Sequence, residues 1–211
     1  MTTIGPVQHG FTNLRGLARR RSLSERCEMC GTGLLAGHPH LVEPLERKIV
    51  CACDACSLLF THDGKTKFKR VPRSARMLWD FRLTDAQWDG LLIPIGMAYF
   101  LKSSVQGRVL AFYPSPAGAT ESTLPLGSWE DIVHDNPALS DMESDVEALL
   151  VSRLDHARQP ETDQYYIAPI DRCYELVGLI RFHWRGLSGG AEVWNEIRQF
   201  FDRLQAAVPR A

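Results

Sequence analysis

The sequence lacks most of the features that would assign it to a membrane, secreted or fibrous class. It has no run of about 18 apolar residues that could span a membrane. The opening MTTIGPVQHGF has neither an apolar signal-peptide core nor an Arg-rich amphipathic helix. There is no internal repeat and no low-complexity tract, and 45% of the 211 residues are hydrophobic. We therefore expect a cytoplasmic protein made of one domain or two small ones.

The common catalytic motifs are also missing. The chain contains no P-loop, no dinucleotide-binding fingerprint, no HExxH sequence and no nucleophile elbow. Enzymes without these motifs exist, so their absence lowers the expectation of catalysis without excluding it. An enzyme built on the C-terminal part of the chain remains one of the open interpretations.

Charge is unevenly distributed although the net charge is only -1. Residues 1–76 hold 13 basic and 6 acidic side chains, whereas residues 77–211 hold 11 and 19. Two segments with different roles, or a face complementary to a partner, would both produce this pattern. Arg19, Arg20 and Arg21 belong to a basic tail at residues 1–24. No aromatic residues are interleaved with them, so nucleic-acid binding is a weaker interpretation than a solvated tail.

Cysteine is concentrated in one stretch, because five of the six cysteines lie between residues 27 and 56. Cys27 and Cys30 form a C-x-x-C-G motif, and Cys53 and Cys56 form a second C-x-x-C motif. Two residues between thiolates let both sulfurs of a tight turn face one ion, and Gly31 supplies the backbone freedom such a turn needs. Residues 40–43 and 47–51 are strand-like and predict a hairpin that brings the two pairs together. The pattern predicts a zinc-ribbon-like metal module at residues 25–76, with these four cysteines as ligands.

The identity of the ion is open between zinc and iron. A closed site of four cysteines is typical of structural zinc, whereas rubredoxin-type electron carriers hold iron with two similar pairs. Ser57 stands where a second turn glycine would be expected, which disfavours the rubredoxin interpretation. Cys51 is surplus to four ligands; it could replace or exchange with Cys53, and we favour an ordinary buried strand residue. His38 and His40 are interpreted as polar loop residues rather than ligands.

Residues 77–211 predict an α+β domain with a small antiparallel sheet. Capping-box spacing at Thr84, Ser128 and Ser144 predicts three helix starts. Residues 93–101 and 108–114 predict a buried hairpin, and residues 164–170 a third strand. Two further helices are expected, one from Asp171 as cap to Trp184 and one with an apolar stripe from Val193 to Leu204. After Cys56, the turn at residues 63–64 separates two more strand-like runs.

A few other residues could form a site in this second domain. Residues 112–122 are expected to be a strand that runs into a loop carrying Glu121, and such loops can bind a ligand or partner. Glu175, His183 and Arg185 flank a helical stripe and are favoured as surface or helix-end residues. Cys173 lies on that stripe and is favoured as a core residue, since the sequence shows no Cys/His pair.

The motifs CEMCG, HPHLVE, CACDACSLLF, AFYPSPAGATESTLPL and DRCYELVGLIRFHWRGLSGGAEVW resemble an uncharacterised bacterial family. Its members are encoded beside actinobacterial-type nickel-iron hydrogenases. The resemblance runs from about Cys27 to the C-terminus and brings no established activity. It implies an accessory, maturation or electron-transfer role, and it carries over the four paired cysteines.

Together these features predict a non-catalytic, metal-binding accessory protein. The expected partner is a protein, either a hydrogenase subunit or a maturation factor, and the expected cofactor is zinc. The alternatives are a rubredoxin-like iron electron carrier and a nucleic-acid-binding zinc-ribbon regulator.

Overall fold

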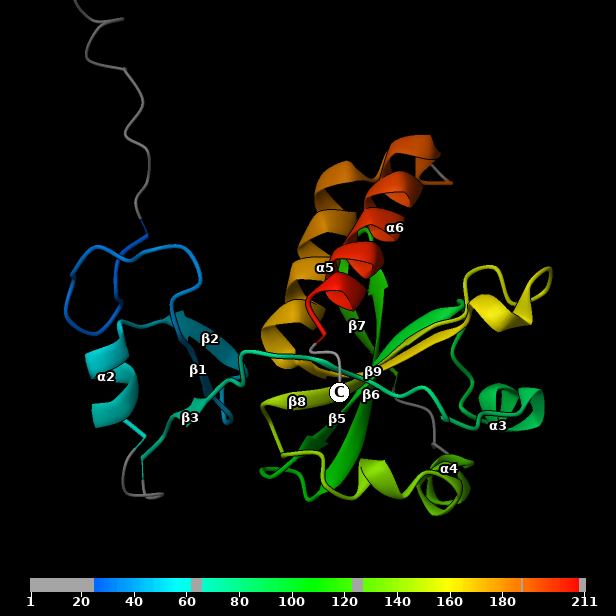
Figure 1. Ribbon diagram of the computed structural model, residues 1–211, viewed down its shortest axis with the longest axis horizontal. Helices are drawn as coiled ribbons and strands as arrows, with labels where there is room; N and C mark the ends of the chain where they lie inside the picture. The colour runs from blue at the N-terminus through cyan, green and yellow to red at the C-terminus, as the bar shows by residue number, and fades with distance from the viewer. Residues whose placement is uncertain (1–24, 62–65, 123–126, 187, 209–211) are drawn as a thin grey trace, which may run out of the picture.

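The structure, a computed structural model, describes residues 25–61, 66–122, 127–186 and 188–208. The basic tail predicted at residues 1–24, with Arg19, Arg20 and Arg21, lies outside the described residues. A small antiparallel sheet near the N-terminal side and a larger antiparallel sheet with helices on both faces make up the fold (Figure 1). The predicted α+β class is confirmed. None of the described helices has the length and apolar character that a membrane crossing requires.

The small sheet has the order β2-β1-β3. The hairpin predicted at its centre is confirmed: β1 (His40–Glu43) pairs with β2 (Lys48–Cys51), and β3 (Lys69–Arg70) pairs with the other edge of β1. The strand predicted just after Cys56 is wrong. Leu58 and Leu59 instead end helix α2 (Asp54–Leu59), whose first turn is capped by the Cys53 side chain as it accepts the Cys56 backbone N–H. The turn predicted at residues 63–64 lies outside the described residues.

The large sheet has the strand order β4-β9-β8-β5-β6-β7. Its predicted hairpin of β5 (Met97–Ser103) and β6 (Arg108–Ser115) is confirmed, as is the strand β9 (Gln164–Pro169). The sheet is larger than predicted because β4 (Arg76–Met77), β7 (Gly118–Ser122) and β8 (Glu147–Ser152) join it. Residues 112–122 were expected to be a strand that runs into a loop; the strand is the end of β6, but the expected loop is instead β7, which pairs with β6 in a second tight hairpin.

Two layers of helices cover the large sheet. Helices α5 (Ile170–His183) and α6 (Gly190–Ala206) lie on one face, and α3 (Asp85–Gly90), α4 (Trp129–Asp135) and the short 3-10 helix η1 (Pro137–Leu139) lie on the other (Figure 1). A second 3-10 helix, η2 (Pro160–Thr162), precedes β9. Strand residues alternate between the layers: Tyr99 packs in the core beneath α5 and α6, whereas Phe100 packs in the core beneath α4.

The helix predictions had mixed outcomes. The capping box of Thr84 and Gln87 is confirmed at α3, and α4 begins after Ser128 although the Ser128 side chain makes no capping hydrogen bond. The helix predicted after Ser144 is wrong, because residues 147–152 form the strand β8, buried on both faces. Helix α5 begins after Pro169 rather than at an Asp171 cap and ends before Trp184, while the stripe predicted for α6 is confirmed.

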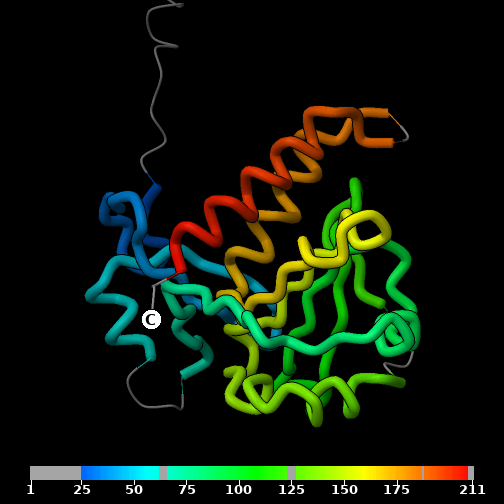
Figure 2. The backbone as a smooth tube through the Cα atoms, turned by 45° about the vertical axis from the view of Figure 1, so that its right-hand side comes forward, coloured from blue at the N-terminus to red at the C-terminus, as the bar shows by residue number. Residues whose placement is uncertain are grey.

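The N-terminal segment (residues 25–76) packs against the C-terminal segment (residues 77–211). Val42, Val71 and Ala75 join the core beneath α5 and α6. The two segments lie side by side in both views (Figures 1 and 2). The predicted domain boundary falls inside β4, whose two residues pair with β9.

Candidate metal centre

The first cysteine pair lies on a tight turn. The Gly31 N–H donates to the Cys27 carbonyl at 2.8 Å, and the Cys27 N–H donates to the Thr32 carbonyl at 2.8 Å. Gly31 has a φ of 75°, a left-handed conformation that glycine adopts without a steric penalty. The turn places the Cys27 and Cys30 side chains on one side, as the C-x-x-C-G motif predicts.

The second pair lies on the first turn of a helix rather than on a second tight turn. Cys53 is the N-cap of α2, and its sulfur accepts the Cys56 N–H at 3.4 Å. Ser57 continues the helix and donates its hydroxyl to the Asp54 carbonyl at 2.8 Å. No left-handed residue is needed here, which explains why a second glycine is missing from the motif.

The four paired sulfurs converge. Those of Cys27, Cys30, Cys53 and Cys56 all lie within 4.8 Å of one another, and the Cys30 and Cys53 sulfurs are 3.8 Å apart. A tetrahedral ion with zinc–sulfur bonds of about 2.3 Å separates its ligands by about 3.8 Å. All four cysteines are free thiols. The arrangement therefore fits one four-coordinate metal ion.

Two of the clustered thiols, Cys27 and Cys56, have pKa values shifted in opposite directions. Burial disfavours the Cys27 thiolate, but N–H groups of Cys53, Cys30 and Met29 outweigh it and lower the pKa of Cys27 to about 6. Burial and the neighbouring thiols raise the pKa of Cys56 to about 12. Four thiolates this close together repel one another unless a cation binds them. Metal binding at this cluster would therefore release the protons of the thiols.

Comparison with known proteins places the cysteine cluster within a protein family. A family model described as a family of unknown function, DUF5947, matches residues 26–208. The chain belongs to this family. A search of curated proteins and a search of solved structures each give no match. The matched range includes all four clustered cysteines, so the candidate site lies within the part of the chain that the family shares.

Cys51 does not join the four-sulfur cluster. Along β1 and β2 the side chains alternate, so Leu41 and Val50 face a small core with Cys27 and Cys56. Cys51 is one residue further on and faces the opposite side, next to His40 and His38. The interpretation of Cys51 as an ordinary strand residue, and of the two histidines as loop residues, overlooked this second group.

The candidate residues of the C-terminal segment do not converge. Glu121 on β7 forms ion pairs with Arg47 and Arg108, Glu175 pairs with Arg172, and His183 pairs with Glu192. Cys173 is fully buried on α5, and burial raises the pKa of its thiol. Arg185 donates to the carbonyls of Phe182 and Trp184 just beyond the end of α5. These residues act in separate surface or core contacts, as the sequence favoured.

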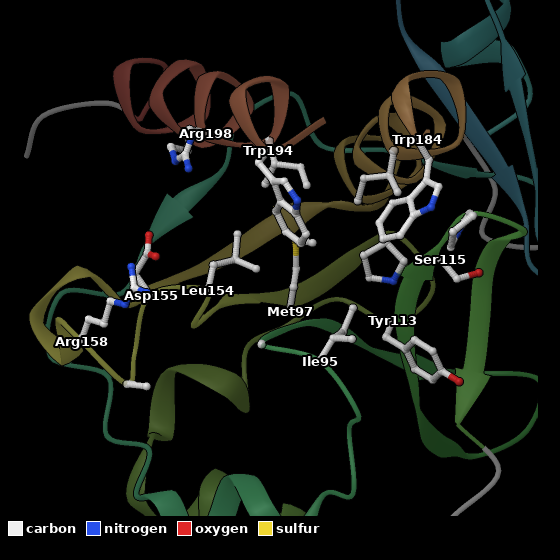
Figure 3. A pocket seen from close by; sticks show the side chains of 16 residues that line it. Ile95, Met97, Tyr113, Ser115, Leu154, Asp155, Arg158, Trp184, Trp194 and Arg198 are labelled. Carbon is white, nitrogen blue, oxygen red and sulfur yellow. The ribbon is translucent and has the colours of Figure 1, made fainter. Parts of the chain in front are cut away.

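Sequence reasoning missed a cleft between the large sheet and its two long helices. The cleft has a volume of about 850 Å³. Trp184 and Trp194 reach down from the helix side toward Met97, while Arg158 and Arg198 stand toward one end (Figure 3). A mostly apolar cleft with a few polar groups is a common form of small-molecule site. The residues that line the cleft come from several separate stretches of chain, so no local sequence motif predicts it.

An ionic network around the buried side chains of Arg153 and Asp163 was also missed. The Arg153 guanidinium, 3% exposed, donates to Asp163 at 3.1 Å and to Asp85 at the start of α3. This hydrogen bond from Arg153 lowers the pKa of Asp85. His156 lies 2.7 Å from the same Asp163 oxygen. The network ties α3 to the connection between β8 and β9. Arg153, His156 and Asp163 all belong to that connection, but Asp85 is 68 residues from Arg153, so the sequence spacing does not reveal the contact.

Proposed function

We propose that Cys27, Cys30, Cys53 and Cys56 bind one zinc ion as a closed structural centre. The observation that carries this proposal is the convergence of four sulfurs with the 3.8 Å spacing of Cys30 and Cys53. Four thiolates leave no coordination position for a substrate, which is the usual form of a structural rather than a catalytic zinc site. In place of the second turn of a zinc ribbon, the proposed module uses the first turn of α2.

The metal would supply folding free energy to the N-terminal segment. Among the described residues, the core on the cysteine side of the β1–β2 hairpin has five buried members: Cys27, Leu41, Val50, Ala52 and Cys56. So few apolar side chains cannot offset the entropy of ordering the segment, and small modules of this kind rely on a metal. Ordered in this way, the module presents a fixed surface to a partner, which supports a non-catalytic accessory role.

Metal content is the first test. Elemental analysis of protein purified without added metal should find about one equivalent of zinc per chain that survives dialysis against a chelator. The protein should be colourless and redox-silent. Stoichiometric iron, with a visible spectrum that changes reversibly on reduction, would contradict the structural proposal and favour the rubredoxin-like electron carrier.

Single substitutions test the ligand set. Replacing Cys27, Cys30, Cys53 or Cys56 with Ser should release this zinc and unfold the module. Cys173→Ser and Cys51→Ser are the matched controls, since neither side chain faces the cluster, and both should keep the chelator-resistant zinc. Loss of that zinc from the Cys51 variant would show that the ligand set is assigned wrongly.

The partner we propose is a subunit or maturation factor of a nickel-iron hydrogenase. The support for this partner is the resemblance noted from the motifs between Cys27 and the C-terminus. Affinity purification of the tagged chain from its native cells, followed by identification of the bound chains, tests it. Recovery of hydrogenase components with wild-type protein, and their loss with Cys53→Ser, is the expected result. Wild-type protein that recovers none of them contradicts this partner.

A further inference from the structure

The face of the β1–β2 hairpin opposite the four-cysteine cluster carries a second convergence of metal-ligating side chains. Cys51 Sγ and one ring nitrogen from each of His38 and His40 lie within 4.8 Å of one another. We propose that these three residues bind a second transition-metal ion, at a site with one coordination position open. None of the three belongs to the four-cysteine cluster, so this proposal and the zinc centre stand on different residues.

Strand pairing builds the group. His40 and Cys51 are directly opposite each other in the β1–β2 register, so their side chains project from the same face of the hairpin. Val42, two residues further along β1, projects from that face too and packs into the core beneath α5 and α6. The hairpin therefore directs this group toward the C-terminal segment, and His38 approaches it from the turn before β1.

His38 is held with one nitrogen ready to bind a metal. Its Nδ1 lies 3.0 Å from the Leu35 carbonyl oxygen, which can only accept, so Nδ1 carries the proton and donates it. The lone pair of the neutral ring is then on Nε2. That nitrogen is buried and has no hydrogen-bond partner, and the side chain is only 8% exposed. A buried ring nitrogen without a partner is costly and points to a missing ligand.

The ring of His40 is also held by a hydrogen bond through Nδ1, in this case to Asp171 of the C-terminal segment. Its Nδ1 lies 2.7 Å from Asp171 Oδ2 on the first turn of α5. A carboxylate that accepts from one nitrogen of an imidazole fixes its tautomer, leaves Nε2 for the metal and strengthens its basicity. Asp171 is thus a positioning residue. Its other oxygen, Oδ1, is buried without a partner, which raises the cost of a simple ion pair at this place.

A plain docking contact explains less of this geometry. An ion pair of His40 with Asp171 would account for the 2.7 Å distance, and Glu25 lies 3.5 Å from His38 Nδ1 as a further ionic partner. Neither contact requires Cys51 to approach both rings, and neither satisfies the buried Nε2 of His38. A bound cation accounts for the 2.7 Å distance of His40 from Asp171, for the approach of Cys51 to both rings and for the unpartnered Nε2 of His38.

The ligand set selects the class of ion. Two imidazoles and one thiolate suit zinc and related borderline transition metals, whereas magnesium and calcium prefer oxygen ligands. Zinc with three protein ligands keeps its fourth position for water or another small ligand. His40 and Cys51 are both partly exposed. Because Asp171 belongs to the C-terminal segment, occupation of the site would also tie the two segments together.

Titration of the metal-free, reduced protein with Co²⁺ tests the proposal. Cobalt is a spectroscopic stand-in for zinc, and its thiolate charge-transfer absorption reports how many sulfurs are bound. Wild type should take up two equivalents: one with the signal of four thiolates and one with that of a single thiolate. Cys51→Ala and His38→Ala should each take up only the first, while His134→Ala, which removes an exposed histidine on α4, should take up both. Zinc-loaded variants should keep the circular dichroism of wild type.

Asp171→Asn separates a positioning role from a structural one. The variant should still bind two equivalents, with the affinity of the second step weakened about 10- to 100-fold and that of the first unchanged. Wild type that saturates at one four-thiolate equivalent would overturn the second site and leave the zinc centre standing. Absence of the four-thiolate signal would instead contradict the zinc centre. Loss of that signal in Cys51→Ala would place Cys51 in the first ligand set and overturn this proposal.

Discussion

Asp145 joins three parts of the molecule through one carboxylate. It lies just before β8 with a φ of 72°, a left-handed conformation that Asp adopts more readily than most residues. Lys69 of β3 approaches its Oδ2 at 2.7 Å, and the Ser104 backbone N–H donates to its Oδ1 at 2.9 Å. The carboxylate therefore holds the N-terminal segment against the β5–β6 hairpin.

Replacing Asp145 with Asn should destabilise the protein in a pH-dependent way. Burial disfavours the charged carboxylate, but the hydrogen bonds from Lys69 and Ser104 outweigh it and lower the pKa of Asp145. Asn keeps the size and the left-handed preference but loses the charge, so the free energy of unfolding should fall by about 1.5 to 3 kcal/mol near neutral pH. Urea unfolding of both proteins measures the difference.

The sign of the pH dependence follows from the direction of that pKa shift. The charged contact contributes fully above the unfolded-state pKa of about 3.9 and is lost as the pH falls through the lower folded-state pKa. The gap between wild type and Asp145→Asn should therefore be constant from about pH 7 to pH 5 and close below about pH 4. A gap that persists unchanged in acid would show that the charge does not contribute.

At the scale of elements, glycine marks the start of α6. Gly189 is the N-cap with a φ of 85°, and a Cβ there would lie 2.8 Å from Val193 Cγ1 and 3.1 Å from the Trp184 ring. Gly189→Ala should lower the free energy of unfolding by about 1 to 3 kcal/mol, from backbone strain and the clash together. Thermal and urea unfolding measure this loss.

Gly178 provides the matched substitution. It lies in the middle of α5, is exposed, and has open space where a Cβ would be. Gly178→Ala should therefore leave the fold unchanged and raise the free energy of unfolding by about 0.5 to 1 kcal/mol, because Ala loses less backbone entropy than Gly in a helix. Equal effects of the two substitutions would contradict the turn geometry at Gly189.

Local patterns decided which elements could be predicted. The stripe of α6 is visible because Val193, Ile197 and Phe200 recur with helical spacing on one face. β8 has no such periodicity, since its six residues are all buried between two layers, and a short apolar run of this kind does not distinguish strand from helix. The N-cap of α2 is a cysteine rather than a common capping residue, so no capping signal distinguishes the apolar residues just after Cys56 from a short strand.

Local patterns also decided which of the two candidate metal sites could be predicted. The four clustered cysteines were predictable because two short-range motifs define them. The group of His38, His40 and Cys51 was not, because it depends on strand register and on Asp171, which is 131 residues from His40. Contacts between distant segments leave no trace in local spacing.

At the scale of the whole molecule, the charge asymmetry is partly satisfied within the chain. Basic residues of the N-terminal segment pair with acids of the C-terminal segment: Arg47 with Glu121 and Lys69 with Asp145, each at 2.7 Å. Arg76 and Glu147 form a further pair at 3.7 Å. One role of the basic surplus is therefore to orient the N-terminal segment on the large sheet, which accounts for part of the complementarity expected of a partner surface.

A fragment beginning at Met77 tests how far the two segments depend on each other. As far as the described residues show, the core beneath α3 and α4 contains no member from residues 25–76. Val42, Val71 and Ala75 are the described residues of that segment that are buried in the core on the other face. The fragment should therefore unfold cooperatively, with a free energy of unfolding about 2 to 5 kcal/mol below that of the full chain because these side chains no longer cover the core. Calorimetry measures both quantities.

A longer fragment beginning at Thr66 is the control, because it restores Val71, Ala75 and Arg76, which completes β4, without the hairpin or the clustered cysteines. It should recover part of the lost stability, and the remainder should depend on the Arg47–Glu121 ion pair and on Val42. A broad, non-cooperative transition in both fragments would contradict the independent fold. It would mean that the N-terminal segment, and the metal that orders it, completes the core of the whole chain.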